Sequence, residues 1–314
     1  MKAALAAVLV LAAGVFPLAA REGYFTHLAI TMLVFSMLAA SLNLLMGYTG
    51  LVSIAHGAFF GIGGYTSGIL AVRHGVPFWL ALPAAALVTA LIALAIGLPS
   101  FRTRGVYYII VTVAFQIIAS EIFDNWHTVT GGGLGLKGIP RPGGTLFQSK
   151  VGYYYLTLVI ALAVHAGLAG VIRSPLGLSL MAIRDNETKA LALGLSPIRY
   201  KLFVFVLAAA VAGLAGSVYV HYVEYAHPDF FNFFVSVDLF LAVMLGGAGT
   251  VAGPLFGVFV LEVLREVLHE FVAARLLLFG ILLVVSIVFL PQGALRPLAG
   301  YARSRLPLRP VTKS

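Results

Sequence analysis

Residues 24–46 read YFTHLAITMLVFSMLAASLNLLM, a stretch without a single Asp, Glu, Lys or Arg. A helix needs about 20 largely apolar residues to cross the hydrocarbon core of a bilayer, and this stretch is long enough. Similar stretches recur along the chain, so we expect an all-α, polytopic membrane protein whose residues 1–314 form a single transmembrane domain. About ten transmembrane helices are predicted, at residues 3–20, 24–46, 53–73, 78–98, 105–123, 152–172, 202–220, 235–247, 254–268 and 272–290.

The composition agrees with this class and excludes several others. Of the 314 residues, 61% are hydrophobic and 10% are charged, whereas soluble domains contain about 25% charged residues. The chain therefore has too few polar residues to cover a soluble enzyme, and it does not fit a disordered or nucleic-acid-binding protein. It contains no Cys, which excludes a disulfide framework and a thiolate metal site. The GxSxG and HExxH motifs are also missing, so we expect no catalytic residues and no metal ligands.

The positions of the basic residues predict the orientation of the chain in the membrane. The sequence has 20 Lys and Arg against 11 Asp and Glu, a formal net charge of +9. Basic residues gather on the cytoplasmic side of membrane proteins. With ten spans and a cytoplasmic N-terminus, that side receives loop 173–201, the basic tail at 291–314 and the short loop that holds Arg102 and Arg104. We therefore expect both termini in the cytoplasm.

The first apolar stretch has a second interpretation. Lys2 precedes it and Leu18-Ala19-Ala20 ends it, which is the shape of a cleaved secretory signal. Only three residues separate it from the next apolar stretch, which favours a membrane span. Both interpretations stay open.

Two Gly-rich stretches depart from ordinary membrane helices. Residues 43–67 read NLLMGYTGLVSIAHGAFFGIGGYTS, and residues 244–257 read MLGGAGTVAGPLFG. Close helix packing explains any single glycine, and a hydrogen-bonded neutral imidazole explains His56. The functional interpretation is a pair of broken helices, related by an internal repeat, beside a translocation pathway. The residues that we expect along this pathway are Asn43, Gly47, Gly50, Ser53, His56, Gly57, Gly61, Gly246, Gly247 and Gly249.

Residues 124–151 form a long loop that the topology places outside the cell membrane. It contains Trp126, several threonines and the run Gly131-Gly132-Gly133. Loops of this length are uncommon in compact domains unless they have a function. Three interpretations of this loop stay open: it covers the outer mouth of a pathway, it binds a partner protein, or it only connects two spans.

The cytoplasmic loop at 173–201 reads RSPLGLSLMAIRDNETKALALGLSPIRYK. Ser174-Pro175 and Ser196-Pro197 are each typical of a helix start, and Gly194 of a helix end. These signals predict one or two short helices before the next span. An amphipathic helix on the inner leaflet is one interpretation. The balanced charges of residues 184–187, RDNE, favour a protein partner instead.

Several segments resemble the branched-chain amino acid ABC importer permeases. AIRDNETKALALG at 182–194 and SPIRYKLFVFVLAAAVAGLAGSVY at 196–219 resemble the cytoplasmic coupling loop and the following span of that family. SLNLLMGYTGLVSIAHGAFFGIGGYT at 41–66 resembles its N-terminal block. RGVYYIIVTVAFQ at 104–116 and NWHTVTGGGLGLKGIP at 125–140 are similar to the M-type rather than the H-type permeases. The resemblance covers residues 24–292.

This resemblance implies a permease subunit in a bacterial inner membrane that is not itself an enzyme and holds no cofactor. It implies assembly with a homologous permease, two cytoplasmic ATPase subunits that bind ATP, and an extracytoplasmic solute-binding protein that delivers leucine, isoleucine or valine. The chain has no GxxxxGK[ST] motif, which agrees with ATP binding on other subunits. The residues that the resemblance implies for coupling to the ATPases are Ala182, Ile183, Arg184, Asp185, Asn186, Glu187, Ala190 and Gly194.

Two alternatives stay open at this point. The same family fold could import urea, short amides or another small solute. An ion-coupled carrier is the other alternative, and such carriers place ionisable residues deep within their spans. Here the charged residues of the predicted spans lie towards span ends, where snorkelling or local pairing explains them. They are Glu121, Asp238, Glu262, Arg265 and Glu266.

Overall fold

The computed structural model describes residue 14 and residues 23–101, 103, 105–267 and 280–281. Apart from residues 14, 280 and 281, the predicted spans 3–20 and 272–290 lie outside the described residues, as does the basic tail at 291–314. Nearly all of the described chain is helical, as the all-α prediction requires. The main helices are α2 (Gly23–Thr49), α3 (His56–His74), α4 (Phe78–Ser100), α5 (Val106–Asn125), α8 (Lys150–Arg173), α9 (Pro175–Asp185), α10 (Glu187–Ala192), α11 (Pro197–Val223), α12 (Phe233–Gly246) and α13 (Gly253–Val267).

Six of the described helical segments are long and apolar enough to cross a membrane, which confirms a multi-pass helical membrane protein. α3 and α13 occupy two more of the predicted spans. Glycines dilute the apolar character of α3, and α13 has only 15 described residues. The six segments are α2, α4, α5, α8, α11 and residues Pro228–Gly246. A total of about ten spans stays a prediction.

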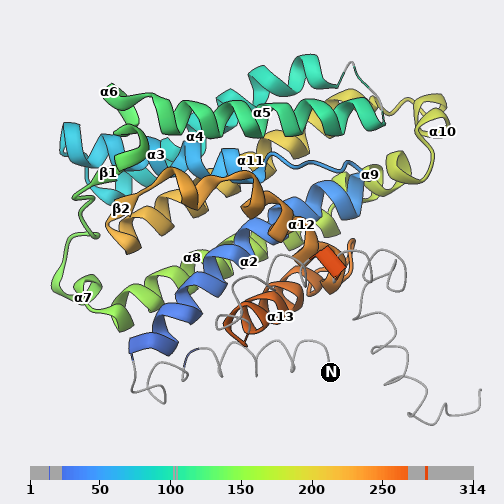
Figure 1. Ribbon diagram of the computed structural model, residues 1–314. Coiled ribbons are helices and arrows are strands. Elements are labelled where there is room, and N and C mark those ends of the chain that lie inside the picture. Colours follow the sequence, from blue (N-terminus) through green and yellow to red (C-terminus); the bar gives the residue numbers. More distant parts are fainter. Residues whose placement is uncertain (1–13, 15–22, 102, 104, 268–279, 282–314) are drawn as a thin grey trace, which may run out of the picture.

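α2 and α11 form the centre of the bundle. Of the residues in their most apolar segments, 61% and 67% are buried, against 28% in each of α4, α5 and α8. α11 packs against α2, α3 and α4, while α8 covers another side of α2. Figure 1 shows α2 crossing the middle of the molecule between α5 at one edge and α13 at the other. The outer helices therefore keep apolar side chains for lipid, and the two central helices bury theirs in protein.

The predicted external loop is folded against the segment that follows α11. It forms α6 (His127–Thr130), the 3-10 turn η1 (Gly132–Leu134), strand β1 (Leu136–Lys137) and α7 (Thr145–Gln148). After α11 come strand β2 (Tyr225–Ala226) and the 3-10 turn η2 (Pro228–Phe231). β1 and β2 pair antiparallel, with Leu136 opposite Ala226. The all-α prediction missed these strands, because two residues are too few to show an alternating pattern.

Arg141 strengthens this contact through an ion pair with Glu224, in which Nε lies 2.7 Å from Oε1. Figure 1 places β1 and α6 at one end of the molecule and α10 at the opposite end. That arrangement is the one required if loop 124–151 is external and loop 173–201 is cytoplasmic.

Candidate functional site

The first Gly-rich stretch contains a break between two helices. α2 ends at Thr49 and α3 begins at His56, so residues 50–55 are not helical. Ser53 and Ala55 are nevertheless fully buried. Gly50 has φ 72°, a left-handed conformation that favours glycine at the point where the chain leaves α2. The first Gly-rich stretch thus contains a buried non-helical link between two helices, and its place beside a translocation pathway stays a prediction.

Side chains from other helices satisfy the backbone of this break. The Ile54 N–H donates to Thr112 Oγ1 on α5 over 3.3 Å. In the first turn of α3, the Gly57 N–H donates to Ser236 Oγ over 2.8 Å. The Ala58 N–H donates to Gln116 Oε1 over 2.6 Å. Buried backbone outside a helix requires such partners, because its N–H groups have no helical acceptors.

Gln116 is the centre of this polar contact. Its Oε1 also accepts from Ser236 Oγ over 2.9 Å, and its Nε2 donates to the Phe231 carbonyl over 2.9 Å. Sequence reasoning missed Gln116. A usable signal was present, because Thr112, Gln116 and Ser120 follow one another at four-residue spacing along an apolar helix and share one face.

Three buried polar side chains lie at the break: Ser53 and Tyr108, whose hydroxyl groups face each other, and His56, whose ring nitrogens have no hydrogen-bond partner among the described residues. Ser53 and His56 are 0% exposed and Tyr108 is 3% exposed. The expectation of a hydrogen-bonded His56 imidazole is therefore wrong. A buried polar group without a partner costs about 1–3 kcal/mol, and this cost applies to the His56 imidazole.

The second Gly-rich stretch is also a break, and it lies against the first. α12 ends at Gly246 and α13 begins at Gly253. The Gly249 N–H donates to Asn43 Oδ1 over 2.8 Å, and Asn43 Nδ2 donates to the Thr250 carbonyl over 2.9 Å. A Cβ on Gly47 would overlap the Gly249 backbone nitrogen. Asn43 and Gly47, which lie on one face of α2, thus hold residues 249–250 of the second break beside the C-terminal end of α2.

The loop at 173–201 forms two helices, and most of the helix start and end signals predicted for it are confirmed. α9 begins at Pro175 and α11 at Pro197. Ser174 does not cap α9 with its side chain, which instead donates to the Val171 carbonyl over 2.7 Å. Between the two short helices, Asn186 Oδ1 accepts from the Lys189 N–H over 2.9 Å and starts α10.

Arg184 connects this loop to the end of α2, which also holds the second break through Asn43. Its Nη1 donates to the Gly47 carbonyl over 2.6 Å, and its Nε and Nη2 hold Asp185 Oδ1 at 3.2 Å. We call the contact of Arg184, Asn43, Gly47, Gly249 and Thr250 the polar junction. It unites the three stretches that the sequence singles out.

The other predicted coupling residues fall into three groups: buried, half-buried and exposed. Ile183 and Ala190 are 2% and 1% exposed and pack against the membrane helices. Glu187 is half-buried, and its Oε2 lies 2.7 Å from Lys201 Nζ, which joins α10 to α11. The remaining residues face outward and form the accessible side of the loop: Ala182, Asp185, Asn186 and Gly194.

The other predicted pathway glycines lie in close helix contacts. A Cβ on Gly61 would overlap the Phe123 ring, and one on Gly246 would overlap the Gly253 carbonyl. A Cβ on Gly57 would lie 2.9 Å from Ser236 Oγ. The packing interpretation therefore describes these three glycines, whereas Gly47 and Gly249 belong to the polar junction.

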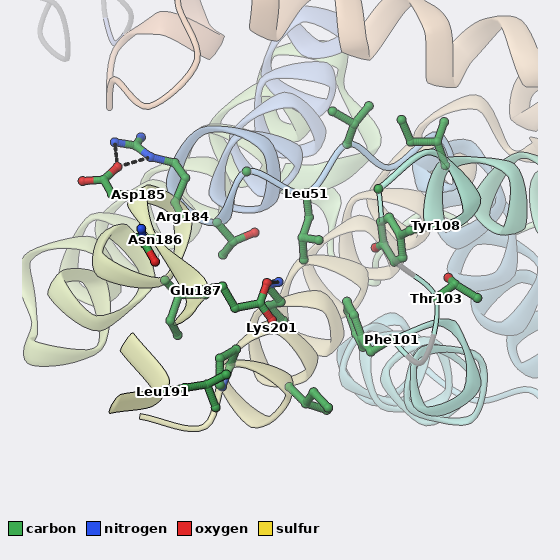
Figure 2. Close-up of a pocket in the computed structure, with 18 of the residues that line it drawn as sticks. Leu51, Phe101, Thr103, Tyr108, Arg184, Asp185, Asn186, Glu187, Leu191 and Lys201 are labelled. Carbon is green, nitrogen blue, oxygen red and sulfur yellow. Dashed lines mark hydrogen bonds and ion pairs between the residues drawn. The ribbon is translucent and has the colours of Figure 1, made fainter. Parts of the chain in front are cut away.

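A cavity of about 810 Å³ lies between the cytoplasmic loop and the first break. Figure 2 shows Glu187, Leu191 and Lys201 on one side of it and Phe101 and Tyr108 on the other. Gly50 is the predicted pathway residue in its lining. The cavity therefore combines an apolar and aromatic wall with a wall that carries both signs of charge.

The charged residues near the other end of α12 pair with one another. Arg265 Nη2 lies 2.6 Å from Asp238 Oδ2, and its Nη1 lies 3.0 Å from Glu262 Oε1. This confirms local pairing of these groups. Within the described residues, no group of three or more His, Asp or Glu side chains could hold a metal ion.

The bundle and its buried breaks define a polytopic helical membrane protein. Residues 24–289 match the family described as branched-chain amino acid transport system / permease component, and the chain belongs to that family.

Individual relatives agree with this assignment. The chain is 33% identical to the LivM permease protein of the high-affinity branched-chain amino acid transport system of Salmonella typhimurium, over 85% of this chain and 69% of the relative. Identity to LivM of Escherichia coli is also 33%, over 93% of this chain and 74% of the relative. Identity to LivH of Escherichia coli is 24%, over 83% and 91%. The higher identity to LivM agrees with the predicted M-type. No solved structure matches the chain significantly.

Proposed function

We propose that this chain is the M-type permease subunit of an ATP-driven importer for leucine, isoleucine and valine. It forms the translocation pathway together with a homologous permease. The observation that carries this proposal is the polar junction, where the cytoplasmic loop meets both helix breaks through Arg184, Asn43 and Gly249. The family and the names of the relatives support the same function.

In this proposal the chain does not hydrolyse ATP. Two ATPase subunits dock on the accessible side of the loop at 173–201, where Asp185 and Asn186 are exposed. A solute-binding protein delivers the amino acid at the opposite end, where β1 and β2 hold the external loop in place. Closure of the ATPases then displaces α9 and α10 and changes the access of the pathway.

The cavity beside the first break supports a branched-chain amino acid as the solute. Leu51, Phe101 and Ile109 offer apolar surface to an aliphatic side chain. Glu187 and Lys201 line the opposite wall but pair with each other, so the apolar wall is the part of the cavity that supports this solute. Urea and short amides have no aliphatic side chain, so the apolar wall would offer them nothing.

Transport by the reconstituted complex tests this proposal. Proteoliposomes containing this chain, its homologous permease, the two ATPases and the binding protein are supplied with ATP and radiolabelled leucine or urea. We expect ATP-dependent accumulation of leucine that unlabelled isoleucine and valine reduce, and no accumulation of urea. Accumulation of urea in place of leucine would contradict the proposed cargo while leaving the permease assignment intact.

A further inference from the structure

Arg184 has a partner inside the permease, although it lies on the loop that the proposed function assigns to the ATPases. Its Nη1 donates to the Gly47 carbonyl over 2.6 Å. Gly47 belongs to the last turn of α2, where carbonyls lose their helical partners because the chain breaks at Gly50. A guanidinium is well suited to this place, since it satisfies a free carbonyl and carries the positive charge that a helix C-terminus favours.

The same guanidinium lies beside the second break. A Cβ built on Gly249 would be 3.5 Å from Arg184 Nη1, and one built on Gly50 would be 3.1 Å from Arg184 Cγ. Asn43, one helical turn before Gly47, binds Gly249 and Thr250. Arg184 therefore binds the last turn of α2 directly, and that turn in turn holds the second break through Asn43.

The helix that carries Arg184 can move it as a unit. α9 has 11 residues, and its inner side is buried through Leu180 and Ile183, which are 1% and 2% exposed. Asp185 Oδ1 fixes the orientation of the guanidinium at 3.2 Å. A displacement of α9 would accordingly be transmitted to the α2 terminus through one short, charge-assisted hydrogen bond.

We propose that Arg184 is a positioning residue that transmits movement of α9 to both helix breaks, and not a residue that binds the ATPase. This inference rests on the proposed function, because that function supplies the movement. Arg184 acts by holding Gly47 and Gly249 in register with the cytoplasmic loop. Loss of the guanidinium uncouples ATP hydrolysis from opening of the breaks but leaves the docking surface in place.

This chain contains no Cys, so two introduced cysteines can be spin-labelled on the isolated chain before it is combined with its partner subunits. Labels replace Val251 in the second break and Phe203 on α11, which are 42% and 49% exposed. The distance between them is measured in the reconstituted complex with and without ATP. We expect ATP to change this distance in the otherwise unaltered chain and to leave it unchanged in Arg184→Gln.

Arg199→Gln is the matched control, because Arg199 is exposed in the first turn of α11 on the same side of the molecule. It should keep the full response to ATP. Arg184→Lys keeps the charge but not the forked geometry, and should show an intermediate response.

Leucine uptake should fall about tenfold in Arg184→Gln, as expected for loss of a charge-assisted hydrogen bond. Basal ATP hydrolysis and the amount of ATPase bound should stay within about twofold, because neither depends on that bond.

Three results would overturn the inference. One is an unchanged response to ATP in Arg184→Gln. The second is dissociation of the ATPases from that variant, which would make Arg184 a docking residue. The third is a distance that ignores ATP in the unaltered complex while leucine uptake still requires ATP. The third result would leave the proposed function standing.

Discussion

Gly47 lies where the two helix breaks meet, and its lack of a side chain is what permits the contact. A Cβ there would overlap the Gly249 nitrogen and the Asn43 amide oxygen. We therefore expect Gly47→Ala to destabilise the protein by about 1–3 kcal/mol, the usual cost of overpacking. Gly170→Ala on α8 is the control, since nothing lies within 4 Å of its new Cβ and alanine favours a helix. Thermal unfolding in detergent measures both variants. An equal melting temperature for the two would contradict the close contact at Gly47.

The ion pair between Lys201 and Glu187 anchors α10 to α11 at 2.7 Å, with side chains that are 15% and 41% exposed. This partial exposure limits its contribution to about 1 kcal/mol, or roughly fivefold in an equilibrium. We expect Lys201→Gln or Glu187→Gln to lower leucine-stimulated ATP hydrolysis by up to about fivefold while the two permeases still assemble. The double exchange Lys201→Glu with Glu187→Lys should recover part of the loss. No recovery would indicate that each residue acts through another partner.

At the scale of whole elements, the structure shows which predictions a single sequence supports. α2, α4 and α5 follow directly from long apolar stretches, and the paired Ser-Pro signals mark the first residues of α9 and α11. Both Gly-rich stretches are confirmed as breaks. Their contact through Asn43 and Thr250 was not predictable in detail, because the two residues are far apart in the sequence and no periodic pattern connects them.

The polar face of α5 is the element that sequence reasoning missed. Gln116 alone supplies partners to Ala58, Ser236 and Phe231. Gln116→Leu would strand several buried polar groups, each costing about 1–3 kcal/mol. We expect a lower melting temperature and loss of uptake in Gln116→Leu. The exposed Gln148→Leu on α7 is the matched control and should change neither. Equal stability of the two variants would show that the break does not depend on Gln116.

At the scale of the whole molecule, paired polar groups lie at the two breaks and at the loop that joins α8 to α11, and a second buried set joins Ser67, Ser217 and His221 between α3 and α11. The paired charges of Asp238, Glu262 and Arg265 provide each other with partners instead of leaving an isolated carboxylate within a span. This pairing gives the three charges a structural role that needs no coupling ion, which agrees with ATP as the energy source of the proposed function.

The energy source is therefore the most direct test of the account. Leucine uptake is measured in proteoliposomes that contain this chain alone under an imposed proton or sodium gradient, and in proteoliposomes that contain the complete complex with ATP and no gradient. The account predicts uptake only by the complete complex with ATP. Gradient-driven uptake of leucine by the chain alone would contradict it.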